Sequence, residues 1–176
     1  LVGYDRSLRI VADILESFEA KEDRVFTLRL RKGHRWSDGQ AFTTEDFRYF
    51  WEDVANNKDL SPTGPPSDLL VEGERPKVEI LDKATLRYSW SKPNPDFLPR
   101  MAGASPLFIY RPAHYLKQFH AKYNKKVAEA ETGGAAKRGW AAVHNKEDNM
   151  YQFDNTRLPT LQPWVNTTRS PADRFV

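Results

Sequence analysis

The chain has 176 residues, with 27 basic and 24 acidic side chains and a formal net charge of +3 at pH 7. Hydrophobic residues make up 39% of it and aromatic residues 12%, which excludes a globally disordered chain and supplies the core of one domain. Cysteine is absent, which excludes disulfides, cysteine-based metal sites and cysteine nucleophiles. No apolar run approaches the roughly 20 residues that a bilayer-spanning helix needs.

The chain begins with a predicted helix and a predicted strand. Residues 8–18 predict a short amphipathic helix, because their apolar positions are spaced as on one helical face. These positions are Ile10, Val11, Ile14, Leu15 and Phe18. Residues 25–30 alternate, with Phe26, Leu28 and Leu30 on one side, and therefore predict a half-buried strand.

A turn and a second helix are predicted next. Asp38 and Gly39 form a dipeptide typical of turns, since glycine adopts a positive φ at little cost. Thr43 suits the N-cap of a helix, and Asp46 is placed to complete a capping box. The apolar stripe of this helix indicates core rather than a ligand box, and consists of Phe47, Phe50, Trp51 and Val54.

The middle of the chain predicts a loop, a hairpin and two further helical pieces. Residues 56–66 are rich in proline and predict a stiff, irregular loop. Residues 78–81 and 85–90 predict a β-hairpin, and residues 97–101 a helical turn. Pro112 suits the first position of a helix, whose inward side chains would be Leu116, Phe119 and Tyr123.

The last third predicts more helix and then an extended segment. Residues 125–145 are alanine-rich and predict a helix in two pieces, interrupted at Gly133 and Gly134. Residues 155–164 predict an extended stretch rich in turn formers. The fold class is therefore α+β, with a small, mainly antiparallel sheet and packed helices.

No motif of catalysis or metal binding is present. His114 and His120 are not spaced to share one helix face, and His144 with Glu147 forms only an isolated pair. We find no phosphate-binding loop, dinucleotide fingerprint or nucleophile elbow. We therefore expect no enzyme, no catalytic residue, no metal and no cofactor.

Basic side chains gather in one short stretch, residues 29–35. Its members are Arg29, Arg31, Lys32, His34 and Arg35. A nucleic-acid footprint would be a larger basic face, so this stretch indicates a solvated strand edge, and nucleic acid is not an expected partner.

One long stretch carries a family resemblance. Residues 25–54 read VFTLRLRKGHRWSDGQAFTTEDFRYFWEDV, a strand ending in LRKG, an aromatic residue, a turn and an aromatic-rich helix. This resembles the signature of the family 5 extracellular solute-binding proteins of bacterial ABC importers. The signature residues are explained by backbone geometry and packing, and are Gly33, Trp36, Asp38, Gly39, Thr43 and Asp46.

Shorter stretches are similar to the same family. They are residues 4–19, 78–90, 110–116 and 158–164. The resemblance implies that residues 1–176 are a single domain within the first lobe of a two-lobed type II binding protein, like the subdomain called Ib. It also implies that residues 155–176 return toward the main lobe, and that both ends of the chain are cut.

The resemblance implies a function in solute import. The full protein would be the periplasmic component of an ABC importer, with a signal peptide outside this chain and an ABC permease as partner. Its solute would be an oligopeptide, or an oligosaccharide, opine or metal complex. Residues that would contact the solute are Ser61, Thr63, Gly64 and Trp164, for which a surface loop and a packed tryptophan are the alternative. A stand-alone protein-interaction module with no transport role is the alternative function.

Overall fold

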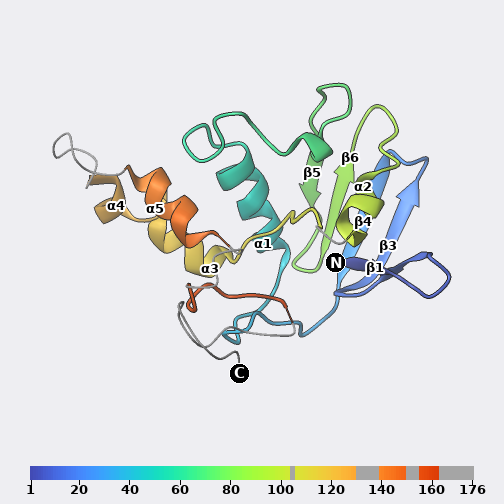
Figure 1. Ribbon diagram of the computed structural model, residues 1–176, viewed down its shortest axis with the longest axis horizontal. Helices are drawn as coiled ribbons and strands as arrows, with labels where there is room; N and C mark the ends of the chain where they lie inside the picture. Colours follow the sequence, from blue (N-terminus) through green and yellow to red (C-terminus); the bar gives the residue numbers. More distant parts are fainter. Residues whose placement is uncertain (104–105, 130–138, 150–154, 163–176) are drawn as a thin grey trace, which may run out of the picture. The chain divides into compact units, whose positions relative to one another are not determined.

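The computed structural model describes residues 1–103, 106–129, 139–149 and 155–162 (Figure 1). Contacts divide the chain into two compact units. Unit 1 consists of residues 1–34 and 43–110, and unit 2 of residues 35–42 and 111–176. Both sheets are in unit 1, and the described part of unit 2 is helical with connecting loops.

The larger sheet of unit 1 has four antiparallel strands in the order β3-β4-β6-β5. The strands are β3 (Leu15–Lys21), β4 (Val25–Leu30), β5 (Lys77–Ile80) and β6 (Thr85–Ser89). A separate antiparallel ribbon joins β1 (Val2–Tyr4) to β2 (Ile10–Ala12). The predicted strand at 25–30 and the predicted hairpin at 78–90 are therefore confirmed, as is the α+β class.

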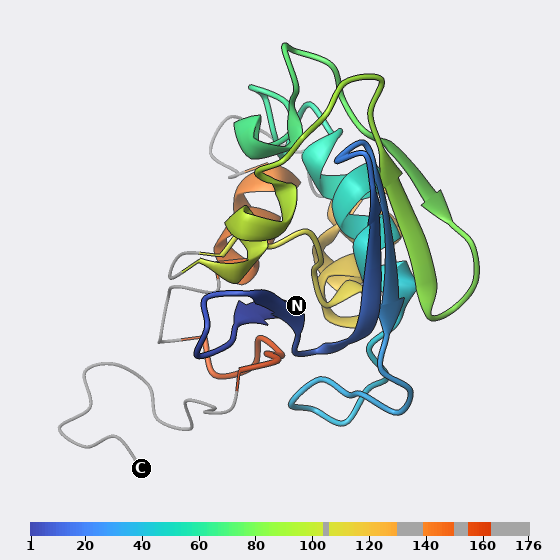
Figure 2. The ribbon, with the colours of Figure 1, turned by 90° about the vertical axis from the view of Figure 1, so that its right-hand side faces the viewer.

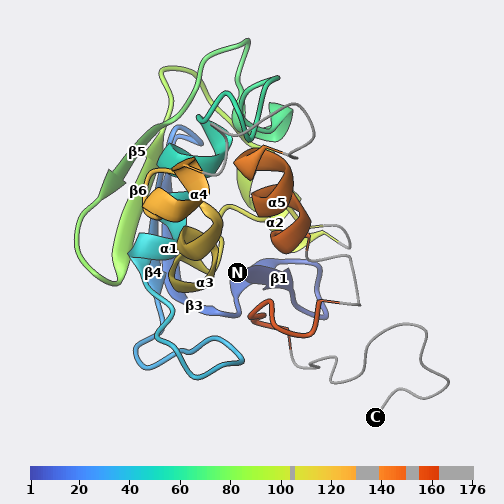
Figure 3. The same ribbon diagram turned by 90° about the vertical axis from the view of Figure 1, so that its left-hand side faces the viewer.

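Alternation along the strands places the core on one face of this sheet. Phe26 and Leu28 of β4 lie opposite Tyr88 and Leu86 of β6, and all four are buried. The intervening residues of β4 point to the other face, where they are half-buried or exposed. Figures 2 and 3 show α1 (Thr44–Arg48) and α2 (Phe97–Ala102) on the same side of the sheet.

Phe97 of α2 lies at the centre of an aromatic cluster in this core. Its ring centroid is 5.0 Å from that of Phe26, 5.2 Å from that of Tyr88 and 5.1 Å from that of Trp90. The indole of Trp90 donates a hydrogen bond to the Leu69 carbonyl, at the end of the short 3₁₀ helix η2 (Ser67–Leu69). The helical turn predicted at 97–101 is thus confirmed, and it covers the sheet.

The helix predicted at residues 8–18 is wrong, because these residues form β2 and the start of β3. Leu15 and Phe18 both pair with inward-facing residues of β4, although they are three positions apart. A bulge at Glu16 inserts one residue between them. The bulge converts the two-residue period of a strand into a spacing that imitates a helix.

The helix after the turn begins as predicted and then widens. Thr43 and Asp46 form the capping box, and α1 continues into the π-helix η1 (Tyr49–Ala55). Phe47, Phe50 and Val54 of the predicted stripe are buried, and Trp51 is half-buried. Tyr49 is fully buried too, outside the stripe that α-helical spacing predicts.

Unit 2 contains α3 (Ala113–Leu116), the 3₁₀ turn η3 (Lys117–Phe119), α4 (Lys125–Glu129) and α5 (Trp140–Glu147). Pro112 was predicted to be the first residue of this helix. It is instead the N-cap of α3, and the helix begins one residue later, at Ala113. Leu116 is buried and Phe119 half-buried as predicted, but Tyr123 is 38% exposed. Helical spacing fails at Tyr123 because η3 ends at Phe119. The predicted break at Gly133 and Gly134 lies outside the described residues.

Candidate functional site

The loop that carries three of the predicted solute contacts follows η1 directly. Asn57 organises its first half, since its side-chain oxygen accepts from the backbone N–H groups of Asp59 and Leu60. The Asn57 carbonyl then accepts from the Ser61 N–H. Leu60 and Pro65 are buried and anchor the loop on either side of residues 61–64.

Ser61, Thr63 and Gly64 lie together in one tight turn. The Gly64 N–H donates to the Ser61 carbonyl at 2.9 Å, and Gly64 has φ +88°, a conformation that favours glycine. Behind the turn, Arg75 donates to the Asn56 side chain at 2.9 Å. A Cβ built at Gly64 would lie 3.8 Å from the Arg75 guanidinium. The turn is thus closed by the hydrogen bond between Ser61 and Gly64, and the Arg75 guanidinium lies beside Gly64.

The turn carries two side-chain hydroxyl groups, those of Ser61 and Thr63. Ser61 is half-buried and Thr63 exposed. Among the described residues, none forms a hydrogen bond with either hydroxyl. Two hydroxyl groups on a stiff backbone can donate to and accept from a polar solute. Trp164, the fourth predicted contact, lies outside the described residues.

The family signature includes a turn at residues 36–40, in unit 2, which we call the signature turn. It is closed by backbone hydrogen bonds and by the Asp38 side chain. The Trp36 N–H donates to the Gln40 carbonyl, and the Gly39 N–H to the Trp36 carbonyl. One Asp38 carboxylate oxygen accepts from the Gln40 N–H. Gly39 has φ +85°, and the buried Trp36 packs edge-on against Phe42 with centroids 5.5 Å apart. These contacts give Trp36, Asp38 and Gly39 a structural explanation.

The remaining signature residues, all in unit 1, also have local explanations. Gly33 has φ +79° after β4. The Thr43 hydroxyl accepts from the Glu45 N–H, and the Asp46 carboxylate accepts from the Thr43 N–H at 2.9 Å. This reciprocal pair satisfies donors that the first helical turn would otherwise leave open.

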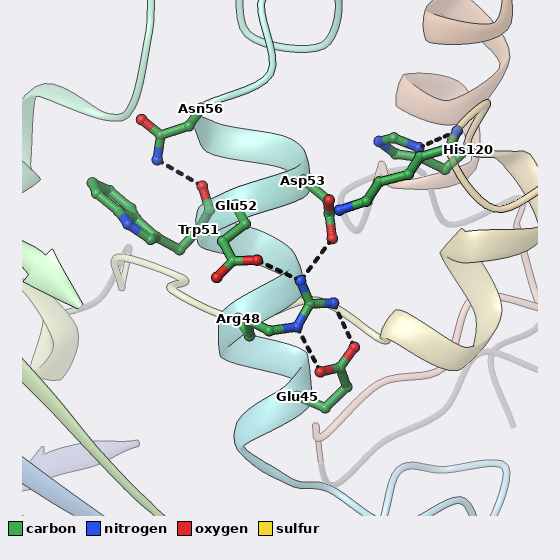
Figure 4. Close-up of polar contacts among 8 residues, drawn as sticks. Glu45, Arg48, Trp51, Glu52, Asp53, Asn56 and His120 are labelled. Carbon is green, nitrogen blue, oxygen red and sulfur yellow. Dashed lines mark hydrogen bonds and ion pairs between the residues drawn. The ribbon is translucent and has the colours of Figure 1, made fainter. Parts of the chain in front are cut away.

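A charge cluster on the α1–η1 helix was missed by the sequence reasoning (Figure 4). Arg48 donates to both carboxylate oxygens of Glu45, at 2.6 and 2.7 Å, and to Glu52 at 2.6 Å. It also lies 3.1 Å from the buried carboxylate of Asp53. Spacings of three and four residues were the available signal. Arg48 thus links three carboxylates of the same helix, and these ion pairs favour the helical conformation.

A second missed cluster lies at the end of α5 in unit 2. The Tyr115 hydroxyl donates to Glu147 at 2.6 Å, and the Asn155 amide donates to the same carboxylate at 3.1 Å. Burial, followed by the bond to Glu147, raises the pKa of Tyr115. Beside it, Arg111 contacts Asp148 at 2.7 Å, and burial raises the pKa of Asp148 against the effect of that guanidinium.

The basic stretch at 29–35 has intramolecular roles at two of its positions. Arg31 donates to the carbonyls of Asp13 and Leu15, and Arg35 donates to the Gly39 carbonyl. Within the described ranges, no three His, Asp or Glu side chains gather as metal ligands would. No helix in that part of the chain has the length and apolarity needed to cross a membrane.

Solved structures of binding proteins share this fold. The chain matches the oligopeptide-binding protein OppA with a TM-score of 0.75 and 33% identity, over 96% of this chain and 26% of that one. It matches MelB of Agrobacterium fabrum C58, solved in complex with stachyose, with a TM-score of 0.62 and 27% identity. That match covers 89% of this chain and 21% of MelB.

Curated relatives are similar over most of the chain. The periplasmic alpha-galactoside-binding protein of Rhizobium meliloti is 27% identical over 93% of this chain, and the periplasmic oligopeptide-binding protein OppA of Salmonella typhimurium is 27% identical over 82%. The chain spans only 21% and 29% of their respective lengths. The family model of bacterial extracellular solute-binding proteins, family 5, matches residues 9–176. The chain therefore belongs to the family 5 bacterial extracellular solute-binding proteins.

Proposed function

We propose that the chain is part of the substrate-binding component of an ABC importer, which captures an oligopeptide or a similar solute outside the cytoplasm. The observation that carries this proposal is the family match across residues 9–176. The fold similarity to OppA, over 96% of the chain, supports it. Relatives named periplasmic support the location, and an ABC permease is the partner that this role requires.

The relatives are binding proteins, and the same role without catalysis is proposed for this chain. A binding protein of two lobes would close on its solute about a hinge. Residues 1–176 would form one domain within the first lobe, and residues 155–176 would lead back toward the main part of that lobe. The solute classes to consider are oligopeptides first, and then oligosaccharides, opines and metal complexes.

Within that role we assign the turn at residues 61–64 to the rim of the solute site. The exposed or half-buried hydroxyls of Ser61 and Thr63 and the backbone near Gly64 support this assignment. Trp164 is proposed as a further contact. Signature residues such as Trp36 and Thr43 are proposed as structural, because their contacts pack the turn against Phe42 and cap helix α1.

The experiment is calorimetric titration of the protein produced from its complete reading frame, with trialanine and stachyose as probes. We expect a Kd in the micromolar range or tighter for one of them. A protein that gives no heat with either probe, and that carries no solute after purification, would contradict the import role.

The double variant S61A/T63A tests the site assignment in the same titration. Loss of two hydroxyl contacts should weaken binding of the active probe about tenfold, since each hydrogen bond contributes roughly 0.5–1.5 kcal/mol. The matched control is S67A, because Ser67 is an exposed serine of the neighbouring helix η2. Equal affinity in the double variant and the control would remove the turn from the site.

A further inference from the structure

The signature turn in unit 2 makes contacts that its own closure does not require. Ser37 contacts a residue 123 positions later in the chain: its N–H donates to the Thr160 carbonyl at 2.9 Å. The Thr160 N–H donates in return to the Ser37 hydroxyl at 3.0 Å. One serine thus satisfies both backbone polar groups of Thr160.

The two carboxylate oxygens of the neighbouring Asp38 contact different residues. One oxygen accepts from the Gln40 N–H and closes the turn. The other lies 2.7 Å from Nε2 of His114, the second residue of α3. The His114 ring also lies against Trp36, with ring centroids 6.2 Å apart. The turn is therefore attached to α3 as well as to Thr160.

The segment at residues 155–162 is fixed at its other end by a different element. The Asn155 amide donates to the carboxylate and to the backbone carbonyl of Glu147 in α5. Between Asn155 and Thr160, the side chain of Pro159 is buried. The Thr160 hydroxyl is not part of the contact with Ser37, because it accepts from the Gln162 N–H.

We propose that the signature turn is a clasp: Ser37 holds the backbone of Thr160 and Asp38 holds α3, so that the turn sets the path of residues 155–162. This gives Ser37, which the family signature did not single out, a role as a positioning residue. The clasp uses only contacts within unit 2 and does not depend on the solute or on the import role. Alanine at Ser37 would leave the donor to the Thr160 carbonyl and remove the acceptor for the Thr160 N–H.

Hydrogen exchange measured by NMR on the 176-residue chain tests the clasp. In S37A the Thr160 amide should exchange about fivefold faster or more, as expected for loss of one hydrogen bond. The amides of β4 and β6 should keep their rates. S37T retains the hydroxyl at an exposed position and should restore the slow rate.

The matched control is T160A, which removes a side chain and keeps both clasp hydrogen bonds. Its residue 160 amide should exchange as slowly as in the unchanged protein. Equal Thr160 exchange in S37A and the unchanged protein would overturn the proposal. So would a Thr160 amide that exchanges at the rate of an unstructured peptide before any substitution. Neither result depends on solute binding, so failure of this proposal would leave the proposed function untouched, and the reverse also holds.

Discussion

At the scale of single residues, His144 is the buried titratable group with the clearest consequence. It is fully buried in α5, and its ring centroid lies 5.7 Å from that of His120 and 6.3 Å from that of Trp140. Burial lowers the pKa of His144 to about 4, and electrostatic interactions with His120 and Arg111 act in the same direction. The folded chain therefore holds this imidazole neutral.

This pKa predicts a loss of stability in acid. The unfolded chain protonates His144 near its ordinary pKa of 6.5 and the folded chain only near 4. The stabilisation is therefore complete above pH 6.5 and lost as the pH falls toward 4. Linkage puts the loss at about 3 kcal/mol. Urea unfolding at pH 7 and pH 4.5 should show a smaller difference in H144Q, and an equal difference would assign the effect to another group.

Two tyrosines are expected to respond oppositely to loss of their hydroxyl groups. Tyr88 is fully buried, and its hydroxyl has no hydrogen-bond partner in the described structure. Tyr115 donates to Glu147 at 2.6 Å. Y88F should leave the free energy of unfolding unchanged or raise it by up to about 1 kcal/mol, whereas Y115F should lower it by about 1 kcal/mol. A clear loss of stability in Y88F would show that the Tyr88 hydroxyl makes a favourable hydrogen bond, contrary to this structure.

At the scale of elements, prediction succeeded where local chemistry and tertiary packing agree. The capping residues Thr43 and Asp46 and the alternation of Phe26, Leu28 and Leu30 were read correctly from the sequence. The strands that contain residues 10–18 were predicted as a helix instead, in part because the bulge at Glu16 gives Leu15 and Phe18 a helical spacing. Tertiary pairing decides such short elements, and a single sequence carries no direct record of it.

The N-cap of α1 gives a test at this scale. T43A removes the hydroxyl that accepts from the Glu45 N–H, and should lower the free energy of unfolding by about 1 kcal/mol. T43S keeps the hydroxyl and should lose much less. The measurement is urea unfolding followed by circular dichroism, and equal stability of T43A and the unchanged protein would show that the capping box contributes little.

The candidate sites were predictable to different extents. The turn at residues 61–64 follows from its proline and glycine, which restrict the backbone locally. The cluster of Tyr115, Glu147 and Asn155 was not predictable, because it joins separate elements through chain reversals that no local pattern specifies. The contact of Ser37 with Thr160 was hidden for the same reason.

At the scale of the whole molecule, the short span of the chain relative to its relatives limits what it should bind. It covers 21% and 29% of the lengths of two curated relatives. A polar solute is bound tightly only where a site surrounds most of its surface. We therefore expect no sub-micromolar Kd for trialanine or stachyose with the 176-residue chain in calorimetry, and a sub-micromolar value would show a complete site within it.

The most direct test of the proposed import role is native mass spectrometry of the protein from its complete reading frame, purified without refolding. We predict a bound extra mass that disappears on denaturation, and its value would distinguish a peptide from an oligosaccharide or a metal complex. A protein that never carries an extra mass, even after incubation with cell extract or the two probes, would contradict a role in solute capture.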